Sequence, residues 1–306
     1  MIYGVTTHKH IGDSIILAGA LHNVKAAHPE LDFTYCGWGM EIWRNNPDII
    51  FDAKPDTMLA EVHYGPVGEE RAASNGNLVE GFTKMLCNHL GIEQVPIVTR
   101  LPYAVLTEAE KEASVKWNGK WLLNANCQTY SRSKGYPWWQ SVVDGLKNDF
   151  EIVQVGSNES RNLSPDLFGV TDYRGKSQNL RDFLSMVYGC AGVISPPSGI
   201  VNFAAAFGKN AVVVNGAREL AKLSDYPNMT FLTNECCGYG KEQGCIALTF
   251  GMNRSCMKPV LRNGQQYAKC MDMISPDTII RAVKADNFIR NSFGIEASSE
   301  SPECDK

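Results

Sequence analysis

The chain has 306 residues, more than one hydrophobic core usually supports, so we expect two domains. Apolar residues make up 44% of the chain and charged residues 20%, which is ordinary for a globular protein in water. The formal net charge is -4 and no dense block of Lys and Arg occurs, so the sequence lacks the electrostatic footprint of a duplex-DNA-binding protein.

The N-terminus lacks a basic stretch followed by a long apolar one, and no apolar run approaches the roughly 18 residues that span a bilayer. We therefore expect a cytoplasmic protein without a transmembrane segment, for which any membrane contact is peripheral. In that reducing compartment the ten cysteines are expected to be thiols or metal ligands and not disulfides.

The first half of the chain alternates short apolar runs with amphipathic segments. We expect strands at residues 2–6, 31–37, 49–53 and 59–64, and helices at residues 14–27 and 77–90. Residues 91–106 lose this periodicity and contain Pro96 and Pro102, which suits a linker between domains. Thr107, followed three residues later by Glu110, is a predicted capping box that opens the next helix.

The second half repeats this alternation. We expect strands at residues 121–125, 151–156, 192–195, 211–215 and 230–233, and helices at residues 138–147, 180–190 and 200–207. Ser275 and Pro276 suit the N-cap and first position of a last helix that reaches about Arg290. Residues 294–306 are polar and are expected to be disordered.

Strands and helices that alternate in both halves predict an α/β protein with two Rossmann-like, doubly wound parallel sheets. Ligands of such sheets bind outside the carboxyl ends of the strands, so function is expected in the loops that lead from strand to helix. No Gly-x-Gly-x-x-Gly follows the first strand and no Walker loop occurs, which argues against a dehydrogenase and a P-loop protein.

The first such loop, residues 8–13, carries candidate proton acceptors. Asp13 stands just before the first expected helix, where it could act as a general base facing the cleft between the domains or serve as the helix N-cap. His10 is a second candidate for the base, or a positioning residue. Gly12 would let another backbone or a ligand come close.

Two loops of the second half suit a diphosphate. The loop at residues 124–139 concentrates hydroxyl groups and cations at Thr129, Ser131, Arg132 and Lys134, although it could also be a solvated loop anchored by Trp138 and Trp139. The loop at residues 195–199 places Ser198 and Gly199 before a helix, where backbone N–H groups can bind an anion and Ser198 can cap the helix.

These loops, taken in order, carry a family resemblance. The matching segments are Gly12-Asp13, residues 21–29, Asn46-Pro47-Asp48, Lys134 with Trp138, residues 173–180 and residues 195–208. Together they resemble glycosyltransferase family 9, the ADP-heptose:lipopolysaccharide heptosyltransferase group with the GT-B fold. The resemblance implies an acceptor domain at residues 1–105, a nucleotide-sugar donor domain at residues 106–275, and a helix at 276–293 that packs back on the first domain.

The resemblance breaks at two positions of the last motif. Pro197 stands where the family usually has Asp, and Asn202 stands where it has His. Since that Asp contacts the donor sugar in the family, the resemblance does not fix the sugar, and heptose and another hexose-like sugar both stay open. Ser198 and Gly199 keep a nucleotide-diphosphate donor in place, with Asn202 beside it, and Glu219 is similar to an acidic residue that binds a nucleoside hydroxyl in many GT-B enzymes.

Cysteines crowd into residues 236–270, which resembles a cysteine-containing branch of the family. Cys237, Cys245, Cys256 and Cys270 are candidate ligands of a structural zinc or iron, with Cys236 as an alternate to its neighbour. Some protein-directed heptosyltransferases similar to the family carry a four-cysteine iron site. Free buried thiols are the alternative, because the spacing matches no common zinc ribbon.

The expected reaction is sugar transfer with inversion at the anomeric carbon, with Asp13 as base, Lys134 on the leaving diphosphate and no catalytic cofactor. The acceptor is a glycan or another hydroxyl compound. Transfer to nucleic acid or protein stays open, as does an inactive nucleotide-sugar binding module. A sugar-nucleotide epimerase of the same architecture would need further acids and bases, which the sequence does not offer.

Overall fold

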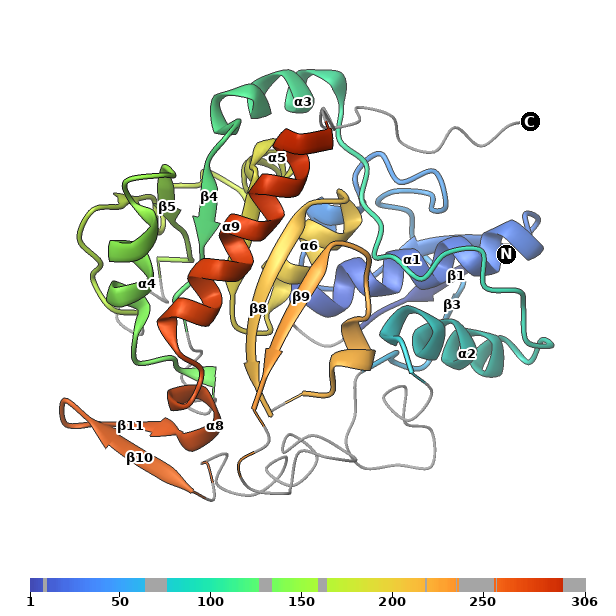
Figure 1. Cartoon of the computed structure of the whole chain (residues 1–306). Helices are drawn as coiled ribbons and strands as arrows, with labels where there is room; N and C mark the ends of the chain where they lie inside the picture. Colours follow the sequence, from blue (N-terminus) through green and yellow to red (C-terminus); the bar gives the residue numbers. More distant parts are fainter. Residues whose placement is uncertain are drawn as a thin grey trace.

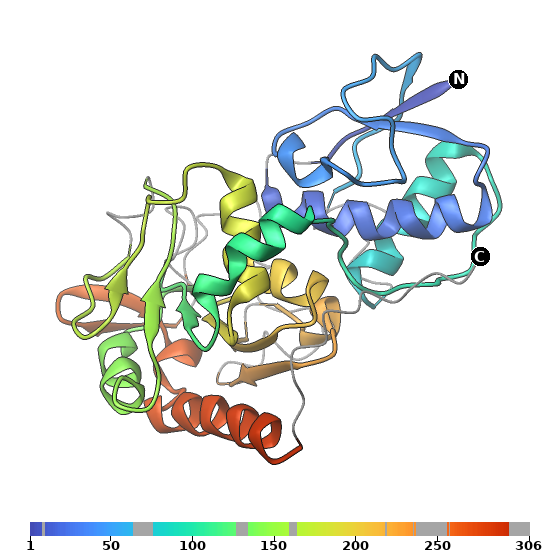
Figure 2. The same cartoon turned by 90° about the horizontal axis from the view of Figure 1, so that it is seen from above.

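The structure is a computed structural model that describes residues 1–7, 10–63, 76–126, 134–158, 164–217, 219–234, 236, 256 and 258–293, the last eight as backbone alone. Its framework is two parallel sheets and one antiparallel hairpin (Figure 1). Seen from above, the first sheet and its helices lie beside the larger second sheet (Figure 2). Within these residues no helix combines the length and apolar character needed to cross a membrane.

The first sheet has the strand order β2-β1-β3, with all pairs parallel. Its strands are β1 (Ile2–Val5), β2 (Asp32–Tyr35) and β3 (Thr57–Met58). Its helices are α1 (Ile11–Ala27) and α2 (Leu78–Leu90), which pack against each other, and a 3-10 helix η1 (Met40–Trp43) follows β2. The crossovers place the start of α1 and the loop before η1 at the carboxyl end of this sheet.

The sequence expectation holds for most of this domain and fails at two expected strands. Residues 49–53 form turns in which Asp52 adopts a left-handed conformation (φ 59), which ends any extended run. Of residues 59–63 only Val62 pairs, in an isolated bridge to Thr7. Helix α1 begins three residues before the expected start, because His10 takes the N-cap position.

The second sheet has the strand order β6-β5-β4-β7-β8-β9, all parallel. The strands are β4 (Trp121–Leu123), β5 (Ile152–Gln154), β6 (Thr171–Asp172), β7 (Gly192–Ser195), β8 (Asn210–Gly216) and β9 (Met229–Thr233). In chain order this is the 3-2-1-4-5-6 arrangement of a doubly wound Rossmann sheet, so the order reverses between β4 and β7. The predicted α/β class is confirmed.

Helices cover both faces of the second sheet. They are α3 (Glu108–Ser114), α4 (Trp139–Leu146), α5 (Leu180–Gly189), α6 (Gly199–Ala206) and α9 (Pro276–Phe293), with 3-10 turns η3 (Val115–Trp117) and η6 (Ala221–Ser224). Leu122 and Val193 face the buried cluster formed with α5 and α6, whereas Leu123 and Ile194 face the cluster formed with α4 and α9. Successive strand residues thus enter opposite cores.

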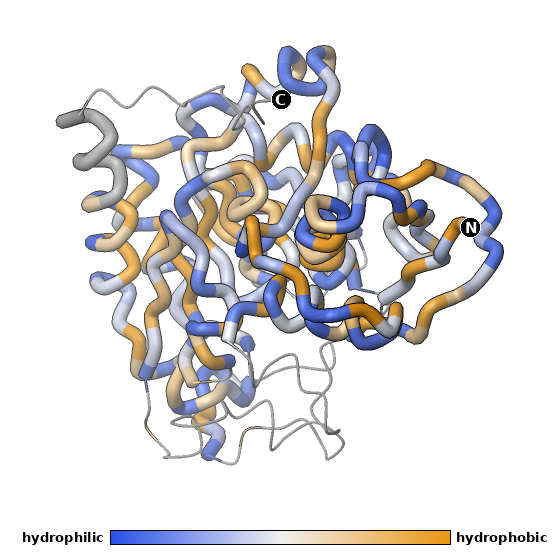
Figure 3. Tube along the Cα trace, turned by 90° about the vertical axis from the view of Figure 1, so that its right-hand side faces the viewer, coloured by the Kyte–Doolittle hydropathy of each residue, from blue (hydrophilic) through white to orange (hydrophobic). Residues whose placement is uncertain are grey.

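Helix α9 packs on α4 and β8, and Lys284 pairs with Asp149 in the turn that follows α4. Along α9 the tube in Figure 3 alternates between hydrophilic and hydrophobic residues, as expected for a helix with one face on a sheet. The domain limits drawn from the sequence, including a return of this helix to the first domain, stay predictions. Residues 294–306 lie outside the described part.

One buried arginine joins the predicted linker to helix α5 and to η1 of the first sheet. Thr107 and Glu110 form the expected capping box at the start of α3. Arg181 of α5 is 5% exposed and pairs with both carboxylate oxygens of Glu110, at 2.7 and 2.5 Å. The same guanidinium donates to the carbonyl oxygens of Val105 in the linker and Glu41 in η1.

A hairpin that the sequence reading did not predict precedes α9. Strands β10 (Pro259–Arg262) and β11 (Gln265–Ala268) pair antiparallel, and α8 (Lys269–Asp272) follows. Asn263 and Gly264 both have positive φ, which is the geometry of a tight two-residue hairpin turn.

Candidate functional site

Polar side chains meet at the point where the strand order reverses. Asn124 follows β4, and its Nδ2 donates to Ser195 Oγ and Ser198 Oγ, each at 3.1 Å. The two hydroxyl oxygens are 2.8 Å apart, and Ser195 at the end of β7 is fully buried. Ligands of doubly wound sheets bind at this switch point, so the network fixes the floor of a candidate site. Sequence reasoning missed Asn124, although its place directly after a strand was a usable signal.

The N-terminus of α6 opens onto this floor. Ser198 occupies the N-cap position, but its side chain makes no capping hydrogen bond because its oxygen is engaged with Asn124 and Ser195. Of the two roles open to Ser198, capping through its side chain is therefore wrong. The Ser198 hydroxyl does not cap the first N–H groups of α6, which are suited to an anion.

The first turn of α1 lies against the first turn of α6. A Cβ atom placed on Gly12 would come within 3.1 Å of both Gly199 Cα and Asn202 Nδ2. Any side chain at this position would be crowded, so the glycine favours this close approach, as expected for Gly12. Two helix N-termini, one from each sheet, thus converge on the same place.

Asp13 projects from the first turn of α1, at this convergence. It is not the N-cap, since that position belongs to His10, whose carbonyl oxygen accepts from the backbone N–H of Asp13 at 3.1 Å. Asp13 is half-buried and His10 is exposed. The alternative of a capping role for Asp13 is overturned, and its carboxylate lies within the first turn, where the helix dipole favours a negative charge.

Two buried phenols lie within reach of the Asp13 charge. Burial, reinforced by that charge, raises the pKa of Tyr35 at the end of β2. The same causes raise the pKa of Tyr226, which is 4% exposed and follows η6. Both hydroxyls therefore stay protonated at neutral pH. No sequence pattern indicates these two residues, because their proximity to Asp13 arises only in the folded chain.

Lys134 reaches the same floor from the loop after β4. Its Nζ lies 2.6 Å from Glu219 Oε1 and donates to the carbonyl oxygen of Pro197 at 2.8 Å. About one fifth of each charged side chain is exposed, at 21% for Lys134 and 19% for Glu219. Asn215 Nδ2 donates to the backbone oxygen of Glu219 and anchors it. Lys134 and Glu219, which are both expected to bind the donor, are thus in direct contact.

Asn202 lies in α6 and is expected to bind the donor together with Ser198 and Gly199. Its Oδ1 is buried and has no hydrogen-bond partner among the described residues. A buried amide oxygen without a partner costs free energy, so a ligand donor at this position would be stabilising. Thr129, Ser131 and Arg132 lie outside the described residues.

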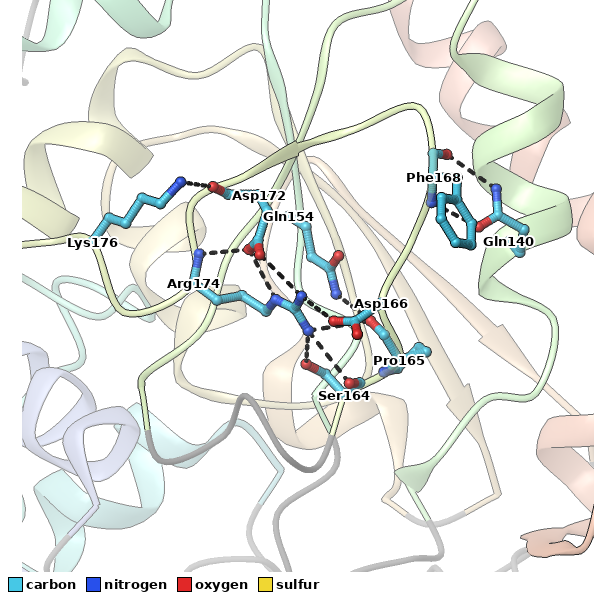
Figure 4. Close-up of polar contacts among 9 residues, drawn as sticks. All are labelled: Gln140, Gln154, Ser164, Pro165, Asp166, Phe168, Asp172, Arg174 and Lys176. Carbon is cyan, nitrogen blue, oxygen red and sulfur yellow. Dashed lines mark hydrogen bonds and ion pairs between the residues drawn. The ribbon is translucent and has the colours of Figure 1, made fainter.

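The segment at residues 173–176, which contributed to the resemblance, builds the loops beside the site. The guanidinium of Arg174 is 3% exposed and pairs with Asp172 and Asp166, and it also donates to Ser164 (Figure 4). These partners join the end of β6 to the loop before it. Arg174 therefore holds the carboxyl edge of the sheet and has its donors occupied by protein groups.

The cysteine segment is described only in part, and Cys237 and Cys245 lie outside the described residues. Cys256 and Cys270 stand just before and just after the paired hairpin β10–β11. Cys256 Sγ accepts the backbone N–H of Lys258 at 3.3 Å, and Cys270 is buried in the core under α9. Where the chain is described, no three His, Cys, Asp or Glu side chains are grouped to hold a metal ion.

Solved structures share this architecture at low sequence identity. A glycosyltransferase of family 9 from Veillonella parvula matches with a TM-score of 0.67 and 13% identity over 94% of this chain and 97% of its own. The ADP-heptose lipopolysaccharide heptosyltransferase II of E. coli matches with 0.66 and 11% over 95% and 100%. The iron-containing dodecameric glycosyltransferase TibC of enterotoxigenic E. coli matches with 0.64 and 13% over 94% and 78%.

A comparison with protein-family models finds no match for the sequence, and a comparison with curated proteins finds none either. The structural likeness confirms the predicted GT-B fold with two Rossmann-like domains.

Proposed function

We propose that the chain is a glycosyltransferase that moves a sugar, with inversion, from a nucleoside-diphosphate sugar to an acceptor hydroxyl. The observation that carries this proposal is the contact of Gly12 with Gly199 and Asn202. It brings a carboxylate on α1 to the N-terminus of α6, which the Ser198 side chain does not cap, so that a proton acceptor and an anion site share one place. The solved structures of similar fold include a heptosyltransferase in complex with ADP-D-β-D-heptose, which supports the choice of donor class.

On the donor side, the diphosphate would lie against the N-terminal N–H groups of α6 and Lys134. Charge develops on the leaving phosphate as the glycosidic bond breaks, and preorganised N–H donors and an ammonium group stabilise it. Because these protein groups supply positive charge, we expect turnover without an added divalent ion. Glu219, which now holds Lys134, would turn to a nucleoside hydroxyl when the donor is bound.

On the acceptor side, Asp13 is the proposed base. It would take the proton of the acceptor hydroxyl as that oxygen attacks the anomeric carbon from the face opposite the diphosphate. His10, whose side chain is exposed beside it, is the second candidate. The sugar itself would lie next to Asn202 and Pro197, and the buried Asn202 Oδ1 offers it an acceptor for a hydroxyl.

We also propose a structural metal held by the cysteine segment. The sulfur of Cys256 lies just before the β10–β11 hairpin and accepts a backbone N–H, and Cys270 lies across the base of the same hairpin. These two residues would supply half of a four-thiolate set with Cys237 and Cys245, and zinc or iron would fit such donors. Elemental analysis of the purified protein tests this, and free thiols without metal would contradict it.

The transferase proposal is tested by incubating the protein with ADP-, GDP- and UDP-sugars, with EDTA present, and measuring nucleoside diphosphate release. We expect release from one nucleotide class, stimulated by an acceptor and slowed at least about a hundredfold in the Asp13→Asn variant. Equilibrium binding of ADP, GDP and UDP is measured in parallel. Binding without release for every donor and acceptor would identify an inactive nucleotide-sugar binding module, and the absence of both would contradict the proposal.

A further inference from the structure

An exposed tryptophan lies at the carboxyl edge of the first sheet. The side chain of Trp38 is 58% exposed, whereas Trp43, Trp121 and Trp139 are almost completely buried. Tryptophan is usually well buried, because its large apolar surface is costly to leave in water. Trp38 follows β2, so it lies at the same edge as the first turn of α1, which carries Asp13.

The backbone that carries this indole is held rigidly. The hydroxyl of Tyr35 donates to the carbonyl oxygen of Trp38 at 2.9 Å, and the ring of Tyr35 stacks on Trp43 with 4.6 Å between centroids. Trp43 in turn donates from Nε1 to Ser14 Oγ at 2.9 Å, next to Asp13 in α1. One chain of contacts therefore ties Trp38 to the helix that presents the proposed base.

Glycines at both sides of Trp38 fix its loop at the junction of the two domains. A Cβ on Gly37 would lie 2.6 Å from the Tyr35 hydroxyl oxygen, so the phenol fits only against a glycine. Gly39 has φ 80, and a Cβ on it would lie 3.4 Å from Ile11 of α1 and 3.9 Å from Leu180 of α5. The loop therefore sits where the start of α1 meets the start of α5.

We propose that Trp38 is the stacking platform for the acceptor and that the acceptor is a saccharide. This inference rests on the proposed function, in which the donor occupies the side of Lys134 and Ser198 and the acceptor approaches Asp13 from the first sheet. A pyranose ring has an apolar face that packs on an indole, while its hydroxyl groups stay in water or bind polar neighbours.

Charge around the loop favours a saccharide over a nucleic acid. Asp13 and Glu61 both act on the phenol of Tyr35, and Glu41 lies at the start of η1, where it accepts the N–H of Leu180. A strand of nucleic acid that stacked a base on Trp38 would bring its phosphates toward these carboxylates. A neutral sugar ring meets no such repulsion.

The test uses an array of immobilised oligosaccharides and single-stranded oligonucleotides, probed with the labelled full chain. The variants are Trp38→Ala and Trp38→Phe, with Phe168→Ala as the control. Phe168 is 78% exposed and precedes β6, an edge strand of the second sheet, whereas Trp38 follows a strand of the first sheet. Affinities for ADP, GDP and UDP are measured for each variant by calorimetry.

We expect the wild type to bind a subset of the saccharides and Trp38→Ala to lose about tenfold in affinity for them. Trp38→Phe should keep most of the affinity and Phe168→Ala all of it, with nucleotide affinities unchanged throughout. Saccharide binding that is equal in Trp38→Ala and wild type, binding of oligonucleotides alone, or no binding to the array would overturn the proposal. So would a parallel loss of nucleotide affinity in Trp38→Ala.

Failure of the transferase proposal gives a different pattern. In that case the wild type neither releases nor binds a nucleoside diphosphate, whatever Trp38 does on the array. If donor turnover is found and Trp38→Ala leaves the acceptor KM unchanged, the transferase proposal stands and the platform is wrong. A rise in acceptor KM with donor KM unchanged supports both.

Discussion

Lys134 Nζ and Glu219 Oε1 lie 2.6 Å apart, so the cation expected to meet the donor diphosphate is paired with a carboxylate. The second partner of Lys134, the carbonyl oxygen of Pro197, holds its head group beside the N-terminus of α6. An incoming diphosphate therefore competes with Glu219 for the same ammonium group. Binding of a donor and rearrangement of this pair are expected to be coupled.

The first prediction follows from that competition. Glu219→Gln removes the competing negative charge, so affinity for inorganic pyrophosphate should rise about two- to tenfold. Lys134→Met should lower it at least about tenfold, since it removes the cation. Calorimetry measures both, with Lys147→Met, a lysine paired with Asp144 on the surface, as the control. Weaker pyrophosphate binding in Glu219→Gln would contradict the competition.

The second prediction concerns the contact between the two helix N-termini. Gly12→Ala adds a Cβ that comes within 3.1 Å of Gly199 Cα, so the helices must move apart by a few tenths of an ångström. Helix propensity favours Ala over Gly by roughly 0.5–1 kcal/mol, which offsets the crowding in the free energy of unfolding. We expect turnover to fall about tenfold or more, with a melting temperature within a few degrees of wild type. Normal turnover would show that this approach does not position the reacting groups.

Local signals account for the parts of the fold that the sequence predicted well. Asn77 caps α2 through its side chain, Gly91 ends that helix in the left-handed conformation, and Thr107 forms the capping box with Glu110. Each of these features depends on residues a few positions apart. The strand predicted at residues 49–53 shows the limit of such signals. The apolar residues there suggested an extended backbone, but Asp52 adopts a left-handed conformation that turns the chain.

The sequence indicated which loops form the candidate site, but not which of their side chains touch one another. Asp13, Lys134 and Ser198 follow strands in sequence, so their edge of the sheet could be inferred from topology alone. That Lys134 would pair with Glu219, and that Tyr226 would lie near Asp13, depends on how the loops after β4 and β8 pack. Neither the periodicity nor the spacing of residues in the sequence predicts how these loops pack. The hairpin turn at Asn263 and Gly264 was readable and was overlooked inside the cysteine segment.

The third prediction concerns the base. Asp13→Asn keeps the shape of the side chain and removes its ability to accept a proton, so turnover should fall roughly 10²–10⁴-fold. Donor affinity should not fall, because the proposed diphosphate site is formed by Lys134 and the N-terminus of α6 and not by the Asp13 carboxylate. His10→Gln is the matched variant and should retain most of the turnover. Should His10→Gln show the large loss and Asp13→Asn little, the two roles must be exchanged.

The fourth prediction concerns a histidine that links α1 to the loop after η1. His22 Nδ1 lies 2.9 Å from Asp48 Oδ2, and this hydrogen bond raises the pKa of His22 against the opposing effect of burial. The raised pKa means that the stabilisation is complete below about pH 6.5 and is lost as the pH rises through the folded-state value. The free energy of unfolding should fall by about 0.2–1 kcal/mol over this range. Urea unfolding from pH 6 to 8.5 measures it, and an equal slope in His22→Gln would contradict the assignment.

The last prediction concerns the arginine that fastens the linker. Hydrogen bonds from Arg181 lower the pKa of Glu110 to about 2, and only 22% of that carboxyl side chain is exposed. A depressed pKa gives stability that is present above the unfolded value of 4.5 and is lost as the pH falls toward 2. We expect Glu110→Gln to lower the free energy of unfolding by about 2 kcal/mol at pH 7, and by much less at pH 3. Arg181→Lys should show part of this loss, because an ammonium cannot reproduce the two parallel hydrogen bonds to the carboxylate. Urea unfolding of both variants and the wild type at the two pH values decides the matter: a Glu110→Gln deficit that is equal at pH 7 and pH 3 would mean that the loss comes from the capping box and not from the ion pair.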